Sequence, residues 1–82
     1  MPNPIPLLIA DVYVPVKRVK TLEADKVEAM ANDILENGQI TPISVREGKG
    51  RYVLIEGYHR LEALRALGEE RVVVYIVQAR QH

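Results

Sequence analysis

The sequence changes at Gly57 from the pattern of a strand to the pattern of a helix. Before this glycine, the run 53–55 is wholly aliphatic, which is typical of a buried strand. After it, leucines recur at three-residue spacing and predict a helix of about ten residues that carries Leu61, Leu64 and Leu67. Because a strand runs into a helix through a single glycine, the chain is expected to combine a sheet with helices.

Two segments before this junction also have clear patterns. From about residue 23 to 36, apolar residues recur at i, i+3, i+4 and i+7 and predict an amphipathic helix with Val27, Met30, Ala31 and Ile34 on one face. Gly38 is placed to end this helix in the left-handed conformation. The β-branched runs 43–47 and 51–55 flank a Gly-Lys-Gly loop, so they are predicted to pair as an antiparallel hairpin.

The two ends of the chain are predicted to be extended. Residues 1–11 contain three prolines, which favour an extended arm and exclude a helix. Valines at alternate positions predict a first strand over residues 12–16, with Pro15 marking its edge or its end. The nearly continuous Val and Ile run 72–77 predicts a last strand that is buried on both faces.

These elements predict a single α+β domain over residues 1–82, in which a small mixed sheet of about four strands carries two main helices. The length suits one domain and not two, because isolated domains mostly contain about 50–200 residues. Ten apolar residues are expected to form the core: Val27, Met30, Ile34, Val45, Val53, Ile55, Leu61, Leu64, Val73 and Tyr75.

The charge balance limits the partners that are expected. Eleven basic residues balance eleven acidic ones, so the domain alone is expected to bind DNA weakly or not at all. A basic cluster at residues 17–20 is typical of a solvated surface, with a contact to phosphate or nucleic acid as the alternative. No apolar run approaches the ~20 residues of a membrane span, and the N-terminal segment lacks the basic leader of a signal peptide.

The absence of cysteine excludes disulfides, thiolate metal sites and a cysteine nucleophile. His59 and His82 lie far apart in the sequence without other ligands at suitable spacing, so no metal site is predicted. Together with the absence of a membrane span, this composition leads us to expect a cytoplasmic protein.

The helix that follows Gly57 is a candidate anion-binding site. The first N–H groups of a helix have no partner within it, and they form the positive end of the helix dipole. Gly57 would let the main chain approach a phosphate closely, and His59 and Arg60 would add donors. The alternative is a purely structural turn, in which Arg60 pairs with Glu56 or Glu62.

Three segments resemble, in order, landmarks of the ParB/sulfiredoxin superfamily: VPVKRV at 14–19, NGQITPISVR at 37–46 and EGYHRLEA at 56–63. The third resembles the Gly-x-x-Arg phosphate motif that holds a nucleoside triphosphate in ParB proteins. In those proteins, helix-turn-helix and dimerisation regions follow this domain. The resemblance therefore implies a larger parent chain or a protein partner, and operator recognition is not expected of these residues themselves.

The resemblance also implies a ligand, which is a nucleoside triphosphate such as ATP or CTP, alone or with Mg²⁺. By position, His59 and Arg60 would grip its phosphates at the Gly57 turn. Lys26 resembles the first-helix lysine that meets the nucleotide in sulfiredoxins, and Gln39 lies in the loop that approaches the nucleotide in the family.

Tyr58 stands where sulfiredoxins carry the cysteine of their Gly-Cys-His-Arg motif, and it is expected to shape the pocket. A phenol with an unperturbed pKa of ~10 cannot replace a thiolate, so sulfiredoxin activity is not expected. The leading hypothesis is a domain that binds a nucleoside triphosphate or phosphate. The second is an enzyme, either a small ATP-dependent phosphotransferase or a ParB-like nuclease, with Glu56 as the base. The third is a protein-interaction module with a structural turn.

Overall fold

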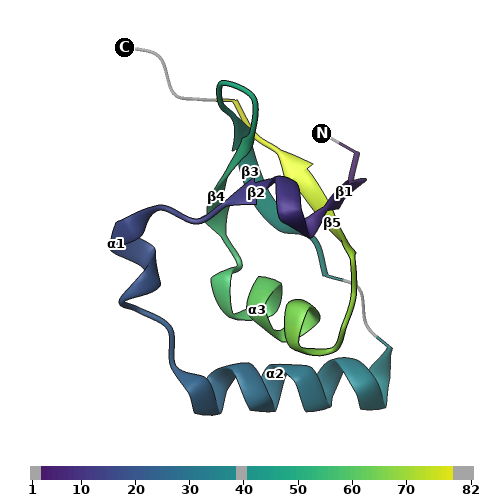
Figure 1. The fold of residues 1–82 in the computed structure, drawn as a ribbon. Helices are drawn as coiled ribbons and strands as arrows, with labels where there is room; N and C mark the ends of the chain where they lie inside the picture. Colours follow the sequence, from purple (N-terminus) through teal and green to yellow (C-terminus); the bar gives the residue numbers. More distant parts are fainter. Residues whose placement is uncertain (1–2, 39–40, 79–82) are drawn as a thin grey trace.

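The computed structural model describes residues 3–38 and 41–78 (Figure 1). None of the helices in these two ranges is long and apolar enough to cross a membrane. In chain order the elements are strand β1 (Ile5–Leu8), a 3-10 turn η1 (Ile9–Asp11), strand β2 (Val12–Tyr13), helices α1 (Val16–Val19) and α2 (Ala24–Asn37), strands β3 (Ile43–Glu47) and β4 (Tyr52–Glu56), helix α3 (Tyr58–Ala66) and strand β5 (Arg71–Ile76).

The five strands form one mixed sheet in the order β1-β5-β3-β4-β2. Strands β3 and β4 pair antiparallel, as the hairpin pattern predicted, and β5 lies parallel to β3 on the other side. The additional strand is β1, which comes from the proline-containing arm and pairs antiparallel with β5. Pro6 is tolerated there because an edge strand does not need every backbone N–H for pairing.

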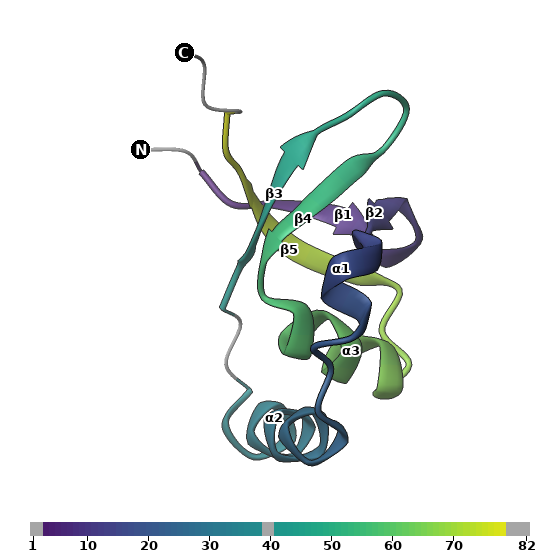
Figure 2. The same ribbon diagram turned by 90° about the vertical axis from the view of Figure 1, so that its left-hand side faces the viewer.

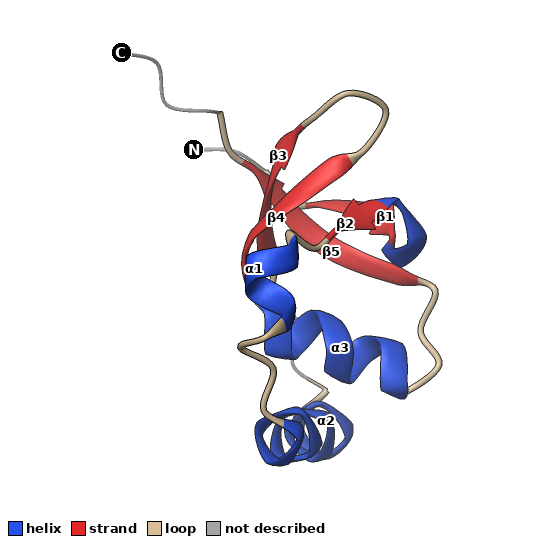
Figure 3. Ribbon diagram, turned by 60° about the vertical axis from the view of Figure 1, so that its left-hand side comes forward, coloured by secondary structure: helices blue, strands red, loops and turns tan. Residues whose placement is uncertain are grey.

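Helices α3 and α2 cover one side of the sheet in two layers (Figures 1 and 3). Helix α3 lies between the sheet and α2, and it buries Leu61 and Ala63 completely. Helix α2 packs mainly on α3 and has no fully buried residue. The apolar face predicted for α2 is therefore only half-buried at Val27, Met30 and Ile34, because it meets a helix and not the sheet.

The core lies between the sheet and α3, and part of its predicted composition is wrong. Val45 and Leu61 are buried in it as predicted, whereas Val53 is buried outside this cluster. In β5, however, Val72 and Val74 are 3% and 0% exposed, whereas the predicted Val73 and Tyr75 are half-buried. The strand alternates between its faces and is not buried on both, because helices cover one face alone. A continuous β-branched run carries no alternation that would indicate the covered face.

The same ambiguity affects β4, where Leu54 is fully buried and the predicted Ile55 is half-buried. Four apolar residues that were not predicted for the core complete it: Ile9, Val12, Ile43 and Tyr58.

The predicted strand over residues 12–16 is shorter than expected. Strand β2 ends at Tyr13, and Val16 starts the short helix α1 (Figure 2). Pro15 is the N-cap residue of α1, where its missing N–H is not needed and its backbone is extended. Proline at this point therefore marks the end of the strand and the start of a helix.

We predict that Leu61→Ala will lower the free energy of unfolding by about 2–5 kcal/mol, because it leaves a cavity where α3 packs on the sheet. Leu35→Ala makes the same chemical change in α2 at a side chain that is 69% exposed, and it should cost less than about 1 kcal/mol. Urea unfolding followed by circular dichroism measures both values. Equal losses in the two variants would contradict the layer order described here.

Candidate functional site

The turn between β4 and α3 depends on the absence of a side chain at residue 57. Gly57 has φ +106°, and a Cβ atom built there would lie 2.5 Å from Cγ2 and 2.8 Å from Cβ of Ile43. The sequence suggested that this glycine leaves room for a phosphate. The structure shows that it leaves room for β3, so that the N-terminus of α3 starts directly beside the sheet.

The first turn of α3 presents unpaired N–H groups. Gly57 is the N-cap residue and no side chain caps the helix. The first bond of the helix runs from the N–H of Leu61 to the carbonyl of Gly57, at 2.9 Å. The N–H groups of residues 58–60 therefore have no partner within the helix, and the helix dipole places partial positive charge at this end.

These groups border a cleft of about 400 Å³. The turn contributes residues 56–60 to its lining, so the structure places Glu56, Gly57, Tyr58, His59 and Arg60 at one cleft. The rest of the lining consists of Arg18 and Thr21 from the α1 region, Met30 from α2 and the segment 41–44 before and within β3.

Arg60 is half-buried and lines the cleft. It forms no ion pair or side-chain hydrogen bond with any residue of the described ranges 3–38 and 41–78. The pairing with Glu62 that a structural turn would favour is absent there, because Glu62 pairs with Arg65 at 3.3 Å. Glu56 is exposed at the cleft and also has no such partner among these residues. Arg60 is thus available to an anion.

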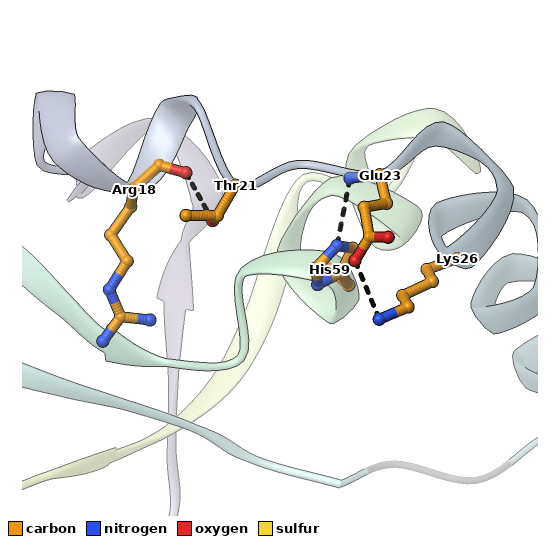
Figure 4. A network of polar contacts seen from close by, with 5 residues as sticks. All are labelled: Arg18, Thr21, Glu23, Lys26 and His59. Carbon is orange, nitrogen blue, oxygen red and sulfur yellow. Dashed lines mark hydrogen bonds and ion pairs between the residues drawn. The ribbon is translucent and has the colours of Figure 1, made fainter.

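Arg18 is a second basic residue of the cleft lining. The sequence predicted a solvated surface for its cluster, with a contact to phosphate as the alternative. The guanidinium Nη2 of Arg18 donates a hydrogen bond to the backbone carbonyl of Ile55. Strand β2 pairs with β4 only as far as Val53, so Arg18 satisfies a carbonyl beyond the end of that pairing. Thr21 Oγ1 donates to the carbonyl of Arg18 at 2.6 Å (Figure 4). A carbonyl is neutral, so Arg18 keeps its positive charge in the cleft.

His59 and Lys26 are connected through Glu23 (Figure 4). The backbone N–H of Glu23 donates to Nε2 of His59 at 3.1 Å. The Glu23 carboxylate holds Nζ of Lys26 at 2.7 Å, and this hydrogen bond and charge raise the pKa of Lys26 above its ordinary value. Lys26 is exposed and lies in a neighbouring hollow that shares Met30 and His59 with the cleft.

The other predicted site residues have different positions. Tyr58 lines the cleft, but it is only 7% exposed and belongs to the hydrophobic core, so its ring is held by packing. Gln39 lies outside the residues that the structure describes. Within the described ranges, no group of three or more His, Asp or Glu residues is placed to hold a metal ion.

Arg18, Thr21, Thr41 and Ser44 were not predicted for the site. For Arg18 the basic cluster was a signal, but it did not distinguish this side chain from its exposed neighbours Lys17 and Lys20.

A mixed sheet, two helical layers and a glycine turn at the cleft define an α+β domain of the ParB/sulfiredoxin type, which confirms the resemblance seen in the sequence. The chain matches the ParB N-terminal domain family over residues 6–82, and it belongs to that family. It is 35% identical over 57 residues to a probable chromosome-partitioning protein ParB of Campylobacter jejuni. That match includes 70% of this chain and 20% of the ParB protein, so the chain spans about a fifth of this relative.

Solved structures share the fold. Sulfiredoxin from Arabidopsis thaliana superposes with a TM-score of 0.82 at 28% identity, over 95% of this chain and 88% of that protein. A C-terminally truncated ParB from Caulobacter crescentus, complexed with CTP-gamma-S, gives 0.80 at 22% identity, over 96% of this chain and 46% of that one. A free serine kinase in complex with AMP gives a TM-score of 0.76 at 19% identity, over 92% of this chain and 31% of that protein.

We predict that Gly57→Ala will destabilise the domain more than Gly68→Ala. Both glycines have positive φ, at +106° and +82°, so each substitution carries a conformational cost of about 1–2 kcal/mol. At residue 68 nothing lies within 4 Å of the new Cβ, whereas at residue 57 it meets Ile43. Thermal and urea unfolding of both variants isolates the additional cost of this contact. Equal destabilisation would show that β3 does not require glycine at the turn.

Proposed function

We propose that this domain binds a nucleoside triphosphate, with the phosphates at the N-terminus of α3. The observation that carries the proposal is Arg60, a half-buried permanent cation beside uncapped helix N–H groups, with no partner among the described residues. Phosphate suits this combination because the N–H groups point at the oxygens and a guanidinium can bind two of them at once.

The rest of the cleft supports a ligand larger than inorganic phosphate. Its volume of about 400 Å³ is within the range of small-molecule sites. Arg18 and Arg60 belong to different elements that both line the cleft, so an extended polyphosphate can meet both cations. Met30, Pro42 and Ile43 add apolar surface, and the hydroxyl groups of the lining offer hydrogen bonds to a sugar or a base.

The fold relatives support a nucleotide as the ligand class, because the ParB structure is a complex with CTP-gamma-S and the serine kinase structures hold AMP or ADP. A Mg²⁺ ion that accompanies the triphosphate would be held mainly by phosphate oxygens. Glu56 is the one carboxylate of the cleft lining among the described residues, and one or two carboxylates are the usual protein share of such a site.

Phosphoryl transfer is the second candidate function. It is favoured by Glu56, which is exposed at the cleft, adjoins the glycine turn and has no ion-pair partner among the described residues. A carboxylate in this place could accept the proton of an acceptor hydroxyl next to the bound phosphates. Incubation with a nucleoside triphosphate distinguishes the two functions. Phosphoryl transfer converts it to the nucleoside diphosphate, whereas binding alone leaves it unchanged.

We predict that ATP or CTP will bind the wild-type domain, and that Arg60→Ala will weaken binding about ten- to a hundredfold, because a charge-assisted hydrogen bond contributes about 1.5–3 kcal/mol. Arg65→Ala is the matched control. It removes the same charge from the same helix, but Arg65 lies outside the cleft and pairs with Glu62. Isothermal titration calorimetry at low salt, with and without Mg²⁺, measures the affinities.

Thermal melts of both variants show whether the fold is retained, which we expect since Arg60 makes no ion pair within the described residues. If the wild-type domain binds neither nucleotide at millimolar concentration, the proposed function is wrong. An equal loss of affinity in the Arg60 and Arg65 variants would place the phosphates elsewhere.

A further inference from the structure

We propose that His59 is a positioning residue, which fixes the start of α2 beside the cleft because its Nε2 accepts the backbone N–H of Glu23. This inference rests on the proposed function for its effect on affinity. It differs from the prediction made from the sequence, in which His59 gripped phosphate directly.

The hydrogen bond at Nε2 determines where the proton of the imidazole lies. Nε2 accepts the backbone N–H of Glu23 at 3.1 Å, and a ring nitrogen that accepts a hydrogen bond cannot carry a proton. A neutral imidazole has one N–H, which must then be at Nδ1. His59 in this arrangement can donate only one hydrogen bond, from Nδ1.

The partner of His59 is a sensitive point of the fold. Glu23 is the N-cap residue of α2, with an extended backbone and no side chain capping the helix. Within the described ranges, the bond to His59 is the only hydrogen bond between α3 and the segment that includes α2 and Glu23. Helix α2 packs on α3 without a fully buried residue, so a directional bond to α3 adds to this packing. The tether therefore helps to fix the orientation of α2.

The position of α2 affects the cleft in two ways. Met30 of α2 belongs to the cleft lining, and it lies between the cleft and the hollow at Lys26. The carboxylate of Glu23 holds the amine of Lys26, so the contacts run from His59 through Glu23 to Lys26 (Figure 4). Loss of the bond at Nε2 would therefore loosen both Met30 in the cleft lining and the amine of Lys26 next to it.

Two amide side chains separate the roles of the two ring nitrogens. Gln at residue 59 places its Oε1 near the position of Nε2 and can accept the Glu23 N–H, but it lacks the Nδ1 donor. Asn is one carbon shorter, so its amide reaches the position of Nδ1 and not that of Nε2. His59→Gln therefore keeps the tether, His59→Asn keeps only a polar group at the position of Nδ1, and His59→Ala removes both.

The experiment combines calorimetry with ATP and CTP and the amide proton shift of Glu23 in ¹H–¹⁵N spectra. We expect His59→Gln to bind within about twofold of wild type, and the Asn and Ala variants to bind about three- to tenfold more weakly, which is the effect of one hydrogen bond. The Glu23 amide proton should stay downfield in the Gln variant and move upfield in the other two.

The reverse order, in which Asn binds like wild type and Gln like Ala, would overturn the proposal and make His59 a direct phosphate donor. A Glu23 amide shift that is unchanged in all three variants would also overturn it. The spectra are recorded without ligand, so they test the tether even if wild-type protein binds no nucleotide. Failure of the proposed function and failure of the tether are thus distinguishable.

Discussion

The contact between Gly57 and Ile43 is the constraint on which the site depends. Strand β4 must turn into α3 with a positive φ, and the turn lies so close to β3 that a Cβ atom would overlap Ile43. This closeness places the uncapped N-terminus of α3 at the end of the sheet, where the segment before β3 and the α1 region already converge. A wider turn would move the N–H groups of α3 away from the other residues that line the cleft. The glycine thus serves the fold first, and the uncapped helix N-terminus at the cleft is the consequence.

Local patterns were sufficient for most of the fold. The junction at Gly57, the hairpin, both main helices and the left-handed Gly38 were predicted because each depends on residues close together in the sequence. The sequence did not predict the fifth strand or the register of β5, because both depend on partners that are distant in the sequence. Strand β1 is extended by its prolines but becomes a strand only by pairing with β5. Val72 and Val74, and not Val73, face the core because β5 lies between β1 and β3 with helices on one side.

The site divides in the same way. Residues 56–60 are consecutive, so the sequence was sufficient to group them around the turn. Arg18 reaches the cleft from 37 residues away, through a bond to the main chain of Ile55, and no sequence pattern indicates a backbone partner. The Glu23 N–H that His59 accepts is equally invisible in the sequence. Lys26 was predicted from the family resemblance, but its amine is bound to Glu23 and lies in the hollow next to the cleft.

A chain with no net charge can still have a local positive field. The field is strongest where cations are not paired with carboxylates. Lys26 and Arg65 are neutralised by neighbouring carboxylates, whereas the guanidinium of Arg18 is held by a neutral carbonyl and that of Arg60 by no described residue. Two arginines opposed by Glu56 leave a small positive excess in the cleft lining. A triphosphate carries several negative charges, so these arginines compensate only part of them, and the helix N–H groups and Mg²⁺ would have to compensate the rest. On the proposed function, a metal-bound nucleotide would therefore suit the charge of the cleft better than a free one.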